Sequence, residues 1–212
     1  MSKAPIAFYF DLMSPFGYIG STQIDELAAR HGRTVDWRPV LVGVTVMKVM
    51  GMKPLPEYPL KGPYLAHDLK RMGKIFGVPV KQHGLKGHNS LAAMRAYVWL
   101  KRDDPERAKA FAQRMFRRLW VDGRDITPVE ASQEEAAALG VDAAALAQAV
   151  ASPEIKSALM ADVESAIAAG VFGVPFFIAD GEPFFGVDHL WMLECWLRDG
   201  AWNCAAAPDR DG

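Results

Sequence analysis

Cysteine is scarce in this sequence, and an excess of either charge is lacking. The 212 residues include two cysteines, Cys195 and Cys204. They form no Cys-x-x-Cys pair and no cluster with histidine at metal-ligand spacing, so neither a disulfide framework nor a metal site is expected. Lys and Arg number 24 against 25 Asp and Glu, a formal net charge of -1. This balance argues against a nucleic-acid surface or a polybasic membrane patch.

Long apolar runs are also lacking. No stretch reaches the roughly 18 consecutive apolar residues that indicate a membrane-spanning helix. The N-terminal residues MSKAPIAFYF enter a strand-like run directly and lack the pattern of a signal peptide. We therefore expect a cytoplasmic protein without nucleic-acid or membrane partners.

Residues 1–43 predict a β-α-β unit. The aromatic and β-branched run PIAFYFD, residues 5–11, indicates a buried strand. Apolar residues at helical spacing follow from Pro15 and end at His31-Gly32, a helix stop signal. Residues 34–42, TVDWRPVLV, indicate a second strand, in which Pro39 favours an edge position or a bulge.

Residues 44–169 predict a mostly helical segment. Glycine and proline are frequent between 44 and 63, which indicates an irregular excursion over the surface. Amphipathic patterns then follow one another from about Tyr64, with start signals at Asp103-Asp104-Pro105, Asp142 and Pro153. We expect five or six helices, the last of which, from about residue 153, belongs with the sheet.

Residues 170–212 return to strands. VPFFIAD (174–180) and EPFFGVD (182–188) predict a hairpin joined at Asp180-Gly181, and HLWMLECWLRDG predicts a closing helix. Two strands at either end of the chain cannot form a stable sheet separately. We therefore predict an α/β, thioredoxin-like fold: residues 1–43 and 170–212 share one four-stranded mixed sheet with helices on both faces, and residues 44–169 form an inserted all-α unit.

Three positions at the ends of the predicted strands each allow two interpretations. Ser14, followed by Pro15, is a natural N-cap, but it also stands where the bare amides of a helix start suit an anion. Val174-Pro175 opens an apolar strand, where a trans proline at an edge or a cis peptide that frees the Val174 backbone for an extended ligand is possible. Asp188 is either another N-cap or a carboxylate that receives a ligand ammonium.

Together, several stretches resemble a known family. They are FYFDLMSPFGYIG at the start, MKVMG and PLKGPYLAHDLKRMGKIFGVP in the middle, LWVDGRDI around Trp120, and VFGVPFFIADGEPFFGVDHLWMLE near the end. Their order and spacing resemble those of the 2-hydroxychromene-2-carboxylate isomerases, within the superfamily of kappa-class glutathione transferases and DsbA-type thioredoxin folds. The specific part is FDxxSPF followed much later by GVPFF.

The resemblance implies glutathione as the cofactor. Ser14-Pro15-Phe16-Gly17 occupies the place of the CPxC motif of related oxidoreductases, so the chain has no thiol of its own to cycle there. The helix start would lower the pKa of the glutathione thiol, and the Ser14 hydroxyl would donate a hydrogen bond to the thiolate. The resemblance assigns the catalytic role to Ser14 and glutathione binding to Ser14, Phe16, Lys48, Val174, Pro175, Phe185, Gly186, Val187 and Asp188.

The implied reaction interconverts 2-hydroxychromene-2-carboxylate and trans-o-hydroxybenzylidenepyruvate in aromatic hydrocarbon catabolism. A thiolate would add to the conjugated carbon, allow rotation about the former double bond, and leave. The candidates to bind the aromatic substrate are Lys61, His88 and Asn89, with His83 beside them. For any single one of these, a solvated surface role is the alternative. The resemblance also implies a homodimer.

Two further functions stay open. A kappa-like glutathione transferase or peroxidase would use the same site on other electrophiles. A non-catalytic thioredoxin-fold binding or chaperone module would have Ser14 only as a cap and would not bind glutathione. A thiol-disulfide oxidoreductase is not expected, because Ser14 and Gly17 stand where the two cysteines are required.

Overall fold

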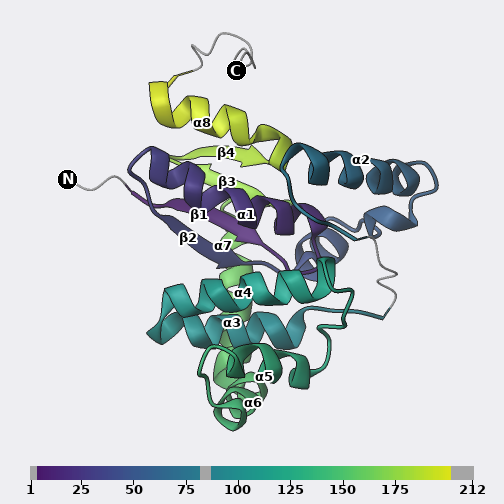
Figure 1. Cartoon of the computed structure of the whole chain (residues 1–212), viewed down its shortest axis with the longest axis vertical. Coiled ribbons are helices and arrows are strands. Elements are labelled where there is room, and N and C mark those ends of the chain that lie inside the picture. Colours follow the sequence, from purple (N-terminus) through teal and green to yellow (C-terminus); the bar gives the residue numbers. More distant parts are fainter. Residues whose placement is uncertain (1–3, 82–86, 202–212) are drawn as a thin grey trace.

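A single mixed sheet forms the centre of the protein. In the computed structural model, which describes residues 4–81 and 87–201, the strand order is β2-β1-β3-β4 (Figure 1). β1 (Ile6–Phe10) runs parallel to β2 (Val35–Pro39) and antiparallel to β3 (Phe176–Ala179), which pairs with β4 (Glu182–Phe185). Strands from both ends of the chain therefore meet in one sheet, which confirms the predicted thioredoxin-like fold.

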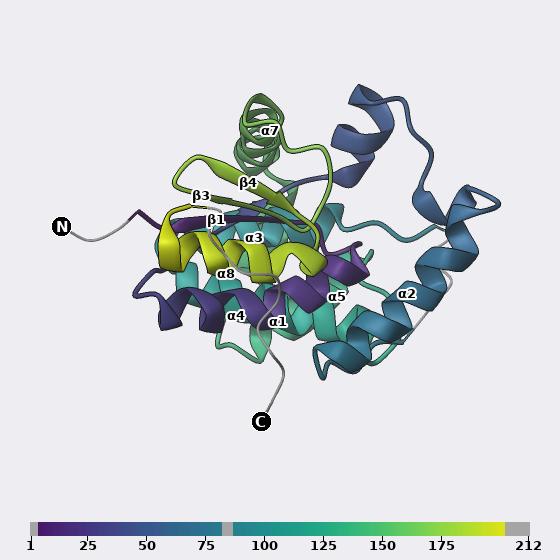
Figure 2. The ribbon, with the colours of Figure 1, turned by 90° about the horizontal axis from the view of Figure 1, so that it is seen from above.

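Helices cover both faces of this sheet. Helices α1 (Pro15–Arg30) and α8 (Leu190–Asp199) lie on one face, and α7 (Pro153–Ala168) lies on the other, as Figure 2 shows. All five residues of β1 are buried, as expected for a central strand covered on both sides. The predicted edge position of Pro39 is confirmed, because β2 is an outer strand.

The middle of the chain is helical. It contains α2 (Lys61–Ile75), α3 (Leu91–Asp103), α4 (Pro105–Trp120), α5 (Val129–Ala137) and α6 (Ala143–Ala151). The side chains of Asp104, Asp142 and Ser152 accept backbone N–H groups at the starts of α4, α6 and α7, so they act as N-caps. Asp104 and Asp142 belong to the start signals expected from the sequence, whereas Ser152 directly precedes the expected signal Pro153. α7 is the helix from about residue 153 that was expected to belong with the sheet, and its Ala166 packs against the sheet.

The segment expected to be irregular is partly ordered. Residues 43–49 form η1 (Gly43–Val49), a π-helix, and Leu55–Glu57 form a short 3-10 helix, η2. The Met50 N–H donates to the Thr45 carbonyl at 3.3 Å, five residues back. π-Helical turns are rare and occur often at functional sites. Proline and glycine frequency indicated the loops around η1 but not the π-helix itself.

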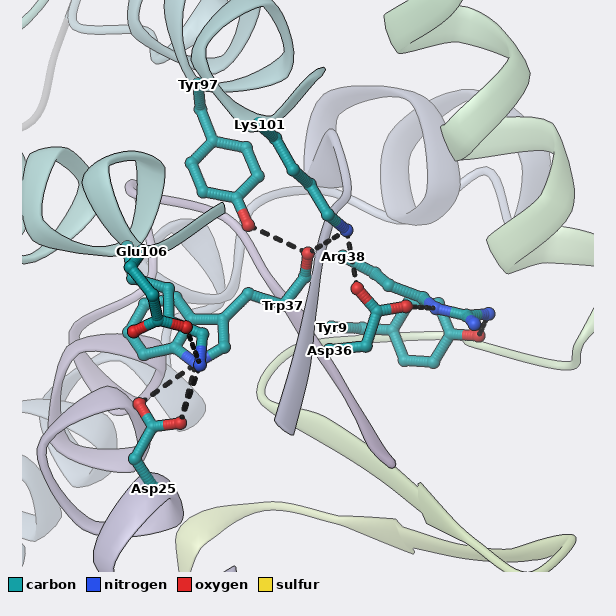
Figure 3. Close-up of polar contacts among 9 residues, drawn as sticks. Tyr9, Asp25, Asp36, Trp37, Arg38, Tyr97, Lys101 and Glu106 are labelled. Carbon is teal, nitrogen blue, oxygen red and sulfur yellow. Dashed lines mark hydrogen bonds and ion pairs between the residues drawn. The ribbon is translucent and has the colours of Figure 1, made fainter. Parts of the chain in front are cut away.

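The outer edge of β2 is closed by the helical segment (Figure 3). The Trp37 carbonyl accepts hydrogen bonds from the Tyr97 hydroxyl at 2.8 Å and from Lys101 Nζ at 2.7 Å, both on α3. Lys101 Nζ also contacts Asp36 Oδ1 at 2.6 Å, and Arg38 Nε donates to Asp36 Oδ2 at 2.8 Å. Burial opposes ionisation of Asp36, but the hydrogen bonds from Lys101 and Arg38 prevail and lower its pKa. An edge that would otherwise present free backbone groups is thus joined to α3.

Cys195 corrects an expectation from the sequence. It lies buried on α8 and is disulfide-bonded, contrary to the expectation that the chain has no disulfide framework. Cys204 lies outside the described residues. Among the helices that the structure describes, none is long and apolar enough to cross a membrane.

Removing the Lys101 ammonium should weaken the joint between β2 and α3. We expect Lys101→Met to lower the free energy of unfolding by about 1–3 kcal/mol, because Asp36 loses a charged partner, and Tyr97→Phe to lower it by about 1 kcal/mol. Because the Asp36 pKa is lowered in the folded state, its contribution is present above the unfolded pKa of roughly 3.9 and is lost as the pH falls through the folded value. Urea denaturation at pH 7 and pH 3 should show the wild-type advantage over Lys101→Met shrinking in acid.

Candidate functional site

Ser14 lies where β1 gives way to α1. Its backbone is extended, with φ -95° and ψ 116°, and its Oγ accepts the Gly17 N–H at 2.9 Å, so Ser14 is the N-cap of α1. The same hydroxyl donates to the Val174 carbonyl at 3.3 Å. The capping interpretation is therefore confirmed, and the hydroxyl also contacts a residue from the far end of the chain.

The first turn of α1 keeps an unused donor. Pro15 has no N–H, and the Gly17 N–H is taken by the cap. The Phe16 N–H makes no hydrogen bond with any residue that the structure describes. No acidic side chain lies in this turn. A helix start carries about half a positive charge, so this turn favours an anionic group beside Ser14.

Val174 presents a second unused amide beside the hydroxyl. The Val174–Pro175 peptide is cis, which confirms one of the two conformations considered from the sequence. The Pro175 carbonyl accepts the Gly186 N–H at 3.0 Å, which joins this turn to the end of β4. Within residues 4–81 and 87–201, the Val174 N–H donates to no acceptor. An extended peptide ligand would find a backbone donor here.

Two glycines let α1 approach this corner. A Cβ on Gly20 would lie 3.3 Å from Pro175 Cβ, so the helix passes close to the cis proline. A Cβ on Gly17 would lie 3.1 Å from Ser14 Cβ and 3.4 Å from its Oγ. Gly17 therefore leaves room for the Ser14 side chain, and Gly20 leaves room for Pro175.

The end of β4 places a carboxylate near the same turn. Gly186 has φ 93°, a conformation that favours glycine, and a Cβ there would overlap the Asp188 carboxylate. Asp188 is 59% exposed, and its contact with an ionisable group is to His189 Nδ1 at 3.5 Å. The capping interpretation of Asp188 is wrong, because His189 occupies the N-cap of α8 and no side chain caps that helix. The Asp188 carboxylate is therefore available to a cationic ligand group.

Two phenylalanines flank the Val174 turn. Phe172 and Phe185 are 47% and 42% exposed, and their ring centroids lie 4.7 Å apart. A Cβ on Gly173 would lie 2.8 Å from the Phe185 ring, so glycine at this position makes room for it. Val187, predicted with this segment, is buried and contributes to the core.

A buried carboxylate supports the loop that carries Ser14. Asp11 is 1% exposed and accepts hydrogen bonds from Met13 N at 3.0 Å, Val42 N at 2.9 Å and Ser90 Oγ at 2.6 Å. Burial raises the pKa of Asp11, although these hydrogen bonds act in the opposite direction. The next residue, Leu12, accepts the Trp120 indole N–H at 2.9 Å.

Sequence reasoning missed these supporting residues. Asp11 was taken only as the polar end of a strand, and Ser90 and Trp120 lie 79 and 108 residues away from their partners. An acidic residue directly after a fully apolar strand was the available signal, because such a carboxylate must find donors when it is buried.

The predicted substrate-binding residues do not gather around Ser14 through any contact among the described residues. Lys48 is exposed on η1, and Lys61 Nζ lies 5.4 Å from the centre of the Tyr58 ring. His88 Nε2 lies 3.6 Å from Asp125 Oδ1. Asn89 Oδ1 accepts the Leu91 N–H at 3.1 Å, so its amide supports the start of α3. His83 lies outside the described residues.

Comparison of the sequence with known proteins finds a matching family model and two kinds of related enzyme. Residues 5–197 match the family model described as DSBA-like thioredoxin domain. The chain is 28% identical over 202 residues to glutathione S-transferase kappa 1 of Homo sapiens, covering 89% of this chain and 88% of that protein. It is 28% identical over 198 residues to 2-hydroxychromene-2-carboxylate isomerase of Sphingobium xenophagum, covering 92% and 98%.

Solved structures share the fold. A structure of 2-hydroxychromene-2-carboxylate isomerase superposes with a TM-score of 0.82 at 24% identity, covering 91% of this chain and 94% of that one. The cytosolic disulfide reductase DsbM of Pseudomonas aeruginosa, solved with GSH, gives a TM-score of 0.62 at 19% identity, covering 92% and 99%. At these identities the similarity establishes the fold.

The raised pKa of Asp11 leads to a pH-dependent stability. Between the unfolded pKa of roughly 3.9 and the higher folded value, the native state binds more protons than the unfolded state, so Asp11 makes stability fall as the pH rises. Asp11→Asn removes this titration. We expect the difference in unfolding free energy, wild type minus Asp11→Asn, to decrease from pH 4 upward in urea titrations. A difference that grows with pH would show that Asp11 ionises more readily in the folded protein.

Proposed function

The chain belongs to the family of DsbA-like thioredoxin domains, and we propose that it is a glutathione-dependent isomerase acting on 2-hydroxychromene-2-carboxylate or a close analogue. The observation that carries the proposal is the Ser14 hydroxyl, which lies 3.3 Å from the Val174 carbonyl beside a helix start with an unused amide. Curated relatives at 28% identity, named as isomerases and kappa glutathione transferases, support the same class of enzyme.

The described residues suit glutathione. The Val174 backbone would pair with the cysteinyl part, which directs the thiol toward Ser14 and the Phe16 N–H. The Asp188 carboxylate, 59% exposed, would receive the ammonium of the γ-glutamyl end. Pro175, Phe185 and Gly186 are proposed to contact the peptide between these two ends, with Val187 supporting them from the core, and Lys48 on η1 is proposed to meet a carboxylate. The Phe16 and Val174 amides and the Asp188 carboxylate therefore match the thiol, peptide and ammonium groups of glutathione.

The residues of the chain have separable roles in this reaction. Glutathione, when bound, supplies a nucleophilic thiolate that the chain itself lacks at this corner. The start of α1 and the Ser14 hydroxyl stabilise negative charge on sulfur, so Ser14 acts as a hydrogen-bond donor and not as the nucleophile. Lys61, His88 and Asn89 are proposed to face the substrate and to donate to its developing enolate oxygen or its carboxylate.

A kappa-type glutathione transferase is the second candidate. The similarity to the human kappa 1 protein equals that to the isomerase, at 28% identity in both cases. Both activities would use Ser14 and the Val174 backbone in the same way. A panel of chromene carboxylates and common transferase electrophiles distinguishes them by which class is turned over.

Ser14→Ala should impair both the cap of α1 and the activation of the glutathione thiol. Loss of the hydroxyl removes an N-cap worth about 1 kcal/mol and a donor to the thiolate. We expect glutathione to bind but its thiol pKa, followed by thiolate absorbance, to rise by about one unit, with turnover at neutral pH falling at least about tenfold. Unchanged thiolate absorbance together with intact turnover would disprove the role of Ser14.

Ser152→Ala is the matched control. Ser152 caps α7 through the Ile155 N–H at 3.2 Å, so its loss should lower stability to a similar extent. It should leave the thiol pKa unchanged. Calorimetry with glutathione tests the binding-module alternative separately, because a module without the site would give no heat at millimolar concentrations.

A cytoplasmic homodimer is proposed with this function. Side chains of Met47, Val49, Met50, Leu60 and Tyr64 are exposed around η1 and α2, an apolar surface suited to burial against a second copy or a substrate. We expect sedimentation equilibrium to give twice the mass of the chain at micromolar concentration. A monomer at that concentration would reject the dimer and leave the isomerase proposal intact.

A further inference from the structure

We propose that Ser90 and Asp11 act as a positioning pair, through which the helical segment fixes the Ser14 loop for thiol activation. The inference rests on the proposed function and deepens it. Neither residue touches the proposed ligand, so both are positioning residues. Their effect would reach the ligand through residues 11–14.

Asp11 joins three parts of the chain at one carboxylate. Oδ1 accepts Met13 N at 3.0 Å and Ser90 Oγ at 2.6 Å, and Oδ2 accepts Val42 N at 2.9 Å. Met13 belongs to the loop before α1, Val42 directly precedes η1, and Ser90 directly precedes α3. The carboxylate thus fixes the start of the segment that carries Lys48 as well as the loop that carries Ser14.

The path from this carboxylate to Ser14 is short. The Ser14 N–H donates to the Asp11 carbonyl at 2.9 Å. The backbone of Asp11 therefore holds Ser14, and its side chain holds Met13. Between them, the Leu12 carbonyl accepts the Trp120 indole N–H at 2.9 Å from the end of α4. Every residue from 11 to 14 therefore takes part in a hydrogen bond, and two of the partners come from the helical segment.

A purely structural role explains this arrangement less well. Burying a carboxylate carries a desolvation cost, and apolar residues of similar volume often fill such sites without loss of stability. Ser90 is 4% exposed and lies at the N-cap position of α3, yet its hydroxyl caps nothing and donates to Asp11 instead. The buried Asp11 carboxylate and the Ser90 hydroxyl, which does not cap α3, both hold the loop before Ser14 in place.

Ser90→Ala is the test, with Ser132→Ala as the matched control. Both serines are buried in the helical segment, but Ser132 Oγ has no hydrogen-bond partner among the described residues. Two readouts are needed. Amide hydrogen exchange of Met13, Ser14 and Val42 is measured without ligand, and the thiol pKa of bound glutathione is measured by thiolate absorbance.

We expect Ser90→Ala to speed exchange at the Met13 and Val42 amides about tenfold and to raise the bound thiol pKa by about half a unit. Ser132→Ala should change neither readout. Faster exchange with an unchanged thiol pKa would overturn the proposal, because the pair would then be structural only. Unchanged exchange would overturn it as well.

Trp120→Phe provides a second variant if Ser90→Ala does not fold. It removes the donor to the Leu12 carbonyl and keeps a buried ring, and we expect the same two changes, since it loosens the same loop. Failure of the wild-type protein to bind glutathione would refute the proposed function. Such a result would also overturn this inference, whereas normal binding with unaffected variants would overturn the inference alone.

Discussion

The candidate site depends on a carboxylate removed from water. Asp11 follows a strand with no exposed residue, and its three hydrogen bonds connect the β1–α1 loop, the start of η1 and the start of α3. A buried carboxylate without such donors would be costly, so the three segments are held together by its need for partners. The place of Ser14 follows from this constraint, as does the departure of η1 from the sheet.

Residues 14–17 contain no cysteine, which distinguishes this protein from a disulfide exchanger that uses a Cys-x-x-Cys pair. The start of α1 carries the Ser14 hydroxyl, and the Phe16 and Val174 amides donate to no acceptor in the part of the chain that the structure describes. A site built this way offers hydrogen-bond donors but no thiol that could act as a nucleophile. In the proposed function the chemistry depends on a sulfur brought by a ligand, and relatives named for glutathione transfer and isomerisation support that proposal.

The local patterns predicted the elements well, and the long-range contacts poorly. The aromatic strands, the Asp180-Gly181 turn and the helix starts at Asp104, Asp142 and Pro153 are local signals, and the structure has each of them. The π-helix was not foreseen, because its period differs from that of α-helices and strands. Ser90 and Trp120 could not be assigned either, since single serines and tryptophans carry no sign of which distant loop they contact. Asp188 was misjudged as a possible cap because the helix begins two residues later.

The contact between Ser14 and Val174 spans 160 positions of the chain. During synthesis β1, α1 and β2 leave the ribosome long before β3 is made. Until then the nascent protein lacks Val174, whose carbonyl accepts the Ser14 hydroxyl. The corner can close only after residue 174 has emerged. A chain terminated before residue 174 would therefore lack this contact and the site that it helps to form.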